Sequence, residues 1–144
     1  QASCALAWRG RSVDAPACAL EMAPLFFAVA AASSNASGPS ASALALLPGA
    51  SGWQSARCCP YPQELLLELE HRAEVHEIEI SARGDFTPKA VDVHISSGGD
   101  FFGTLQDCAF EHAGIVHFDG EATPRRTSAL RRSRLKLFAL CSGH

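Results

Sequence analysis

Short segments in which apolar and polar residues alternate dominate the chain from residue 62 onward. The clearest are residues 64–70, 75–80 and 90–95, where Leu65, Leu67 and Leu69, then Ile78 and Ile80, then Val91, Val93 and Ile95 are spaced by two. Because successive side chains of a β-strand point to opposite faces, this period of two predicts strands with one buried face and one solvated face. The predicted core residues are Leu65, Leu67, Leu69, Ile78, Ile80, Val91, Val93 and Ile95.

Three further segments complete the predicted set of strands. Residues 115–118 and 135–140 are rich in apolar residues, and residues 25–30 combine Phe, Val and Ala. Turn-forming residues occur at 83–85, 97–100, 119–120 and 123–124. Half-polar strands separated by turns predict an all-β fold, an antiparallel β-sandwich, rather than a buried parallel sheet. A helix over residues 64–70 stays an alternative, since Leu and Glu also favour helices.

Residues 22–33 admit two interpretations. An apolar run followed by small residues resembles a short secretory signal peptide, and Asn35 begins a glycosylation sequon, which matters only in a secreted chain. The run lacks the positively charged segment that precedes such a signal, so a strand without processing is preferred. Residues 1–21 show neither period and are expected to be an upstream or disordered segment, which leaves a predicted domain over 22–144.

Composition narrows the class of protein. A chain of 144 residues is the size of one domain, and its net charge of −3 makes general nucleic-acid binding a poor expectation. Polar residues interrupt every apolar stretch before it reaches the roughly 18 residues of a membrane-spanning helix. We therefore expect a domain that takes neither nucleic acid nor a membrane as its partner.

Residues that carry chemistry are present but scattered. The six cysteines contain no C-x-x-C pair that would join the scattered histidines in a zinc site, so no metal or other cofactor is expected. No G-x-S-x-G nucleophile motif or phosphate-binding G-K-[ST] motif occurs, and an enzyme is not predicted. Free, mostly buried thiols in a reducing compartment are preferred over three disulfides.

Charge is segregated along the chain. Residues 60–122 carry thirteen acids and three bases, whereas residues 123–144 carry six bases and no acid. We call residues 125–136, which hold all six bases, the basic stretch. If residues 134–140 form a strand, Arg134 and Lys136 share a face and present a cationic stripe. That stripe either steers docking onto an acidic partner or is neutralised by the acidic segment of the same chain.

One stretch is more specific than alternation, namely residues 51–65, which contain Ser-Gly-Trp-Gln-Ser-Ala-Arg and then a Pro-Gln-Glu step into an apolar strand. It resembles discoidin-like (galactose-binding-like) jelly rolls, and most closely the N-terminal domain of a ciliary-tip centrosomal protein family. Residues 114–119, followed by Arg125 and Arg126, are similar to a later segment of that family. The resemblance covers residues 22–140 and implies a jelly-roll β-sandwich. It also implies a further closing strand, so that a truncated chain lacking its last strand stays an alternative.

The resemblance implies a non-enzymatic protein-interaction module of a ciliary-tip or centriolar microtubule-associated protein that acts in cilium assembly. The implied location is the cytoplasm and cytoskeleton, at the cilium tip and the centriole or basal body. The implied partners are ciliary-tip or centriolar proteins, with tubulin reached through the full-length protein. The family's coiled coil, tubulin-binding TOG domain and zinc-binding segments are not found in these residues. The candidate interaction residues are Trp53, Arg57, Arg125, Arg126, Arg131, Arg132, Arg134 and Lys136.

Two alternatives stay open. Trp53 is either a contact residue or, as preferred, a plug that fills the end of the sandwich. The signal-like segment and the fold together allow a secreted carbohydrate-binding module of the discoidin-like class. The remaining aromatic residues with a polar edge are Tyr61 and Trp8, which offer little stacking surface for a sugar.

Overall fold

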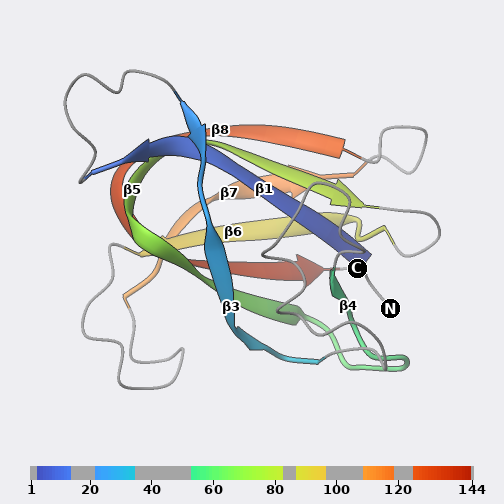
Figure 1. The fold of residues 1–144 in the computed structure, drawn as a ribbon. Coiled ribbons are helices and arrows are strands. Elements are labelled where there is room, and N and C mark those ends of the chain that lie inside the picture. The colour runs from blue at the N-terminus through green and yellow to red at the C-terminus, as the bar shows by residue number, and fades with distance from the viewer. Residues whose placement is uncertain are drawn as a thin grey trace.

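A computed structural model describes residues 3–13, 22–34, 53–82, 87–96, 109–118 and 125–143, with backbone alone for 3–7, 82 and 125–143. The described elements are all strands (Figure 1). No helix that could cross a membrane occurs among these residues. The strands are β1 (Ser3–Ser12), β2 (Ala23–Pro24), β3 (Phe27–Ala32), β4 (Trp53–Gln54), β5 (Gln63–Ala82), β6 (Ala90–Ser96), β7 (Glu111–His117) and β8 (Arg125–Gly143).

The strands form one antiparallel sheet in the order β2-β1-β5-β8-β6-β7. β3 pairs with the first part of β5, and β4 pairs with the start of β1. The long strands β5 and β8 bend together, so that the sheet curls around its own apolar face (Figure 1). The prediction of an all-β antiparallel fold is confirmed, and the curled sheet encloses a core as a β-sandwich does. The jelly-roll connectivity stays a prediction.

The core contains every residue that the alternation assigned to it. The eight predicted residues are each at most 3% exposed, since burial of one face of each strand removes their apolar surface from water. Two aromatic residues join them: Trp8 from β1 and Phe27 from β3 meet edge to face, with ring centroids 6.2 Å apart. Trp53, Val116 and Phe118 are also buried in the same cluster.

β5 is longer than the sequence pattern suggests. The segments 64–70 and 75–80, expected to be separate strands, belong to a single strand of 20 residues, and the helix alternative is wrong. Its pairing with β8 shifts register three times between Glu68 and Glu77. Such irregularities bend a strand and increase its twist, which explains how one continuous strand follows the curl of the sheet.

Residues 3–12, which the sequence suggested lie upstream of the domain, form β1 inside the sheet. β1 pairs with β5 from Cys4 opposite Ala82 to Ser12 opposite Ala73. The strands approach so closely that a Cβ on Gly10 would clash with the Glu74 carbonyl oxygen. The boundary of the domain at residue 22 stays a prediction, but the described sheet includes β1.

Several sequence predictions fall outside the described residues. These are the turns at 83–85, 97–100, 119–120 and 123–124 and the sequon at Asn35. Strand positions are otherwise close to those expected: β3 begins two residues later than predicted, and β7 and β8 extend further toward the N-terminus.

Candidate functional site

Trp53, the first candidate residue, anchors β4 in the core. Its side chain is 2% exposed, and its indole Nε1 donates a hydrogen bond to the Ser34 carbonyl oxygen at 3.0 Å. A buried indole needs a partner for its N–H, and the backbone just beyond β3 supplies it. The ring therefore fills the end of the core, and exposed side chains in this segment begin at Arg57.

A small polar network fixes the segment between β4 and β5. The buried side-chain carbonyl of Gln63 accepts hydrogen bonds from the hydroxyl groups of Ser33, at 3.1 Å, and Ser34. The Gln63 amide donates to the Pro60 carbonyl oxygen. Ser34 Oγ also accepts from the Ala56 N–H at 3.2 Å, and Ser33 Oγ accepts from the Glu64 N–H at 2.9 Å. These bonds tie the end of β3 to both ends of residues 56–63.

The network holds Arg57 on the surface. Arg57 is exposed and lies between Ala56, which is hydrogen-bonded to Ser34, and Cys58, which has a φ of 54°. A positive φ at a residue other than glycine costs free energy and persists where the surrounding contacts enforce it. The arrangement presents a single exposed guanidinium from an ordered turn, a geometry suited to a carboxylate on a partner.

Cys58 and Cys59 are free thiols in the structure, with Cys58 exposed and Cys59 half-buried. Burial raises the pKa of the Cys59 thiol, but hydrogen bonds with the Ser55 and Ser34 side chains help to hold that pKa below its ordinary value of 9.0. Burial, followed by the nearby Cys59 thiolate, raises the pKa of Tyr61. The side chains of the other four cysteines lie outside the described residues. The Cys59 thiolate therefore forms at a lower pH than the thiolate of an ordinary cysteine.

The basic stretch lies on β8, whose backbone runs antiparallel to the acidic β5. Arg125 is opposite Ser81, Arg126 is opposite Ile80, and Arg132 is opposite Val75. Arg131, Arg134 and Lys136 occupy neighbouring positions of the same strand. The side chains of β8 are outside the described part of the chain, so the choice between docking and internal neutralisation stays a prediction.

Strand pairing sets the separation between Trp53 and the start of the basic stretch. Trp53 pairs with Cys4, Cys4 pairs with Ala82, and the neighbouring Ser81 pairs with Arg125. Three strand spacings, roughly 14 Å, therefore separate the backbones at Trp53 and Arg125. Arg131, Arg132, Arg134 and Lys136 lie further along β8, beside the central part of β5 where the register shifts occur.

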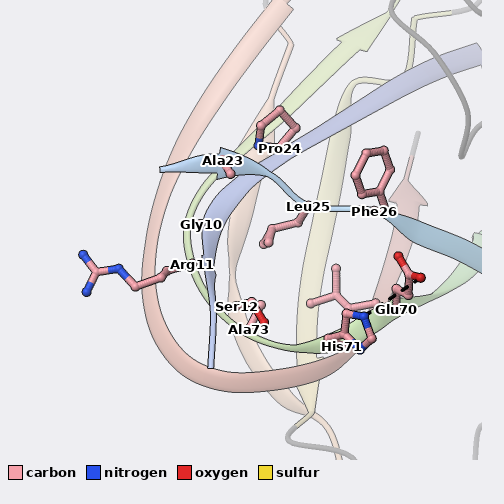
Figure 2. Close-up of a pocket in the computed structure, with 11 residues that line it drawn as sticks. Gly10, Arg11, Ser12, Ala23, Pro24, Leu25, Phe26, Glu70, His71 and Ala73 are labelled. Atoms are coloured by element: carbon pink, nitrogen blue, oxygen red, sulfur yellow. Dashed lines mark ion pairs between the residues drawn. The ribbon is translucent and has the colours of Figure 1, made fainter. Parts of the chain in front are cut away.

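Sequence reasoning missed a pocket between β1 and β3. β3 pairs with β5 as far as Leu69, and β1 pairs with β5 from Ala73 onward. Between these two points neither strand pairs with β5, which leaves a gap. The cavity of about 200 Å³ has Leu25, Leu69 and Ala73 in its wall and Phe26, Glu70 and His71 beside them (Figure 2). A Glu70 carboxylate oxygen lies 4.0 Å from Nε2 of His71. The one sequence signal was the run of apolar residues at 25–27.

His112 contacts both an acid and a second histidine. His112 Nε2 is 3.3 Å from an Asp92 carboxylate oxygen, and its ring meets that of His94 with centroids 5.1 Å apart. Within the described ranges, no group of three or more His, Cys, Asp or Glu side chains is arranged to hold a metal ion. The polar residues thus form local contacts on strand faces and turns.

Fold and surface together define the described part of the chain as an all-β domain with an ordered arginine-bearing turn and a basic strand. A family model described as "Centrosomal protein CEP104, N-terminal domain" matches residues 52–135. The chain belongs to this family. The match includes Trp53, Arg57 and most of the basic stretch. It confirms the resemblance to a centrosomal protein family that residues 51–65 indicated.

Among curated proteins, the chain is similar to human "Centrosomal protein of 104 kDa", with 29% identity over 108 residues. The aligned region is 73% of this chain and 12% of that protein, so the chain spans only a small part of its relative's length. No solved structure matches the chain.

Proposed function

We propose that the chain is a non-enzymatic protein-interaction module of a centriolar and ciliary-tip microtubule-associated protein that acts in cilium assembly. The observation that supports this proposal is membership of the centrosomal family, over a match that contains the ordered Arg57 turn. Its expected location is the centriole or basal body and the cilium tip, within the cytoskeleton.

The proposed contact surface has two parts. The first is Arg57, exposed on a turn whose ends are held by the Ser33–Ser34–Gln63 network. The second is the basic stretch on β8, which begins three strands away from Trp53. Arginines attract acidic surfaces over several ångströms, and a turn whose backbone is already ordered loses little further backbone freedom on binding. The proposed partners are acidic faces of ciliary-tip or centriolar proteins, with tubulin reached through the full-length protein.

Recruitment in ciliated cells tests the proposal. A fluorescent fusion of the chain is expected to concentrate at centrioles, and Arg57→Gln is expected to reduce that signal several-fold. The triple variant R131Q/R132Q/R134Q is expected to reduce it as well. Arg72→Gln, an exposed arginine on β5 outside the proposed surface, is the matched control and should leave the signal unchanged.

Thermal unfolding of each purified variant separates binding from folding. Exposed charges contribute only about 0–1 kcal/mol each, so the variants should unfold within a few degrees of the parent chain. Normal recruitment of both the Arg57 variant and the triple variant would exclude these surfaces as the contact site.

A further inference from the structure

Two adjacent free thiols, Cys58 and Cys59, lie on the turn that presents Arg57. Consecutive Cα atoms are about 3.8 Å apart, so the two side chains stay neighbours in every conformation of the turn. Cys58 is exposed, and Cys59 is half-buried. The proposed contact surface uses the arginine that precedes this pair and gives neither thiol a role.

The surroundings of Cys59 favour its reactive form. Burial raises the pKa of the Cys59 thiol, but hydrogen bonds with the side chains of Ser55 and Ser34 help to hold that pKa below 9.0. The thiolate is the nucleophilic form of cysteine, and a half-buried sulfur is still within reach of a molecule as small as hydrogen peroxide. Cys59 is therefore the attacking thiol of the pair, and the exposed Cys58 is the neighbour that can react with it afterwards.

Ser34 connects Cys59 to the network that holds the turn. Its hydroxyl oxygen accepts a hydrogen bond from the Ala56 N–H at 3.2 Å. A hydroxyl has one proton to donate, so Ser34 gives it either to the Gln63 side-chain carbonyl or to the Cys59 sulfur. A chemical change at Cys59 therefore acts on the same hydroxyl group that holds the residue before Arg57.

The backbone of the reduced turn would not survive a covalent link between the two sulfurs. Cys58 has a φ of 54°, a conformation that surrounding contacts enforce at a residue other than glycine. A disulfide between consecutive residues closes a small ring and sets the dihedral angles of both. Their Cα spacing is also shorter than the roughly 4.4–6.8 Å of ordinary disulfides, so the ring is strained and easily reduced. Ring closure is thus a reversible change next to Arg57.

We propose that Cys58 and Cys59 are an oxidative modification site, at which hydrogen peroxide joins the two thiols in a disulfide and so changes how the turn presents Arg57. The inference rests on the proposed function, because it regulates the arginine that the function uses. Disulfides in reducing compartments are usually transient and redox-sensing, which fits a strained and reversible link.

The chemistry has two steps. The Cys59 thiolate attacks one oxygen of hydrogen peroxide, the O–O bond breaks, and the sulfur becomes a sulfenic acid while the departing hydroxide takes up a proton to form water. The Cys58 sulfur then attacks the sulfenic sulfur, an S–S bond forms, and the sulfenic hydroxyl leaves as water with the Cys58 proton. Two thiols lose two electrons and two protons, and one peroxide is reduced to two water molecules.

Peptide mass spectrometry tests the link directly. Trypsin cleavage after Arg57 and Arg72 releases residues 58–72, which contain this pair and none of the other four cysteines. After treatment of the purified chain with hydrogen peroxide and then an alkylating agent, we expect this peptide to be two hydrogen atoms lighter and unalkylated. Dithiothreitol should restore both thiols. Two intact thiols under conditions that oxidise free glutathione would overturn the site.

A matched pair of variants tests the order of the steps. Dimedone labels sulfenic acids, so it should mark Cys59 in the Cys58→Ser variant, where no second thiol completes the ring. In Cys59→Ser, labelling of Cys58 should be several-fold slower. Equal rates in the two variants would overturn the assignment of Cys59 as the attacking thiol. A disulfide that joins two copies of the parent chain, in place of the ring, would overturn the proposal as well.

Hydrogen exchange tests the effect on the turn. The Ala56 amide, which is bonded to Ser34 in the reduced chain, should exchange several-fold faster after oxidation. The same peroxide treatment should leave this amide unchanged in Cys59→Ser. Equal protection in the reduced and oxidised parent chain would show that the disulfide does not move the turn, which would overturn its control of Arg57.

The outcome is separable from that of the proposed function. In ciliated cells, peroxide should lower the centriolar signal of the parent fusion several-fold and spare that of Cys59→Ser. A disulfide that forms in the purified chain, while the fusion is not recruited at all, supports the modification site and contradicts the cellular role. Recruitment that depends on Arg57, in a chain whose thiols resist peroxide, does the reverse.

Discussion

The two halves of β5 share one strand but have different neighbours. In the second half, β1 places Arg9 opposite Glu77 and Arg11 opposite Glu74, so each of these acids faces a base across the ladder. In the first half, β3 places Ala28 opposite Glu68 and contributes no charge at all. Cross-strand pairs of opposite charge stabilise a sheet, whereas an alanine neither adds nor removes such stabilisation.

The halves also differ in how their backbone edges are covered. β1 has further strands, β2 and β4, on its outer side, while no described strand lies outside β3. The outer edge of the second half is therefore covered within the chain, and Glu74 and Glu77 face a base across the ladder, whereas Glu79 faces Ala7. The first half is fixed by hydrogen bonds at one end, through Gln63, and among the described strands none pairs with the outer side of β3.

The largest effect is expected from removing the indole that anchors the covered half. Trp8→Ala should lower the free energy of unfolding by about 3–5 kcal/mol, because it empties a site that is 1% exposed against Phe27. Urea denaturation followed by circular dichroism measures the loss. Phe26→Ala, at an exposed aromatic position, is the control and should cost far less. An unchanged midpoint for Trp8→Ala would mean that β1 does not contribute to the stable domain.

A smaller loss is expected where β1 crosses closest to β5. Gly10→Ala places a methyl group against the Glu74 carbonyl oxygen and 2.9 Å from a Leu25 methyl, which forces backbone to move. Such overpacking typically costs about 1–3 kcal/mol. Differential scanning calorimetry should show a lower Tm. Ala30→Ser on exposed β3 serves as the control, and a Tm equal to that of the parent for Gly10→Ala would contradict the close approach.

A loss of similar or smaller size is expected at the fixed end of the open half. Gln63→Ala leaves the Ser33 and Ser34 hydroxyl groups without their common acceptor, which should cost about 1–3 kcal/mol. Hydrogen exchange should show faster exchange of the Ala56 amide, which Ser34 holds. Protection of that amide in the variant equal to that in the parent would show that the network does not order the turn.

Charge swaps compare the halves directly, with effects below about 1 kcal/mol. Arg9→Ala should destabilise the chain slightly, since it removes the base opposite Glu77. Ala28→Arg should stabilise it slightly, since it supplies a base opposite Glu68. Both effects should shrink in high salt. Chemical denaturation at two salt concentrations measures them, and equal signs for the two variants would remove the distinction between the halves.

The smallest change concerns a single thiol. In a Cys58→Ser background, alkylation of Cys59 should rise with pH through a midpoint below 9.0, because hydrogen bonds with Ser55 and Ser34 favour the thiolate. Ser55→Ala should move the midpoint upward. Peptide-resolved mass spectrometry reads each site separately. A midpoint that is insensitive to Ser55 would show that this hydroxyl does not tune the thiol.

Period-two alternation was sufficient to predict the central core. Val91, Val93 and Ile95 alternate with polar residues without interruption, so β6 was predicted with its bounds almost unchanged. The same rule could not predict β1, because the alanine, cysteine, serine and glycine residues around Trp8 give little contrast between apolar and polar positions. The rule also fails for Leu66. Alternation places its side chain on the other face of the strand from Leu65 and Leu67, yet all three residues are buried.

The candidate site was predictable only where it is local. The motif around Trp53 and Arg57 lies in one continuous segment and could be recognised from its amino-acid sequence. The network that fixes that segment joins Ser33 and Ser34 to Gln63, about thirty positions away, a separation that no local pattern encodes. The pocket is likewise assembled from β1, β5 and the residues before β3, and depends on where two strands stop.

The long partnership of β5 with β8 also sets an order of events during synthesis. β1, β3 and β5 leave the ribosome in sequence, but β8 begins 43 residues after Ala82, where β5 ends. At about 5–20 residues per second, the β8-facing edge of β5 waits roughly 2–9 seconds for its partner. During that time the edge of β5 that faces β8 is unpaired, and chaperones bind such edges. A nascent chain of this family is therefore expected to depend on chaperones until its basic strand has been synthesised.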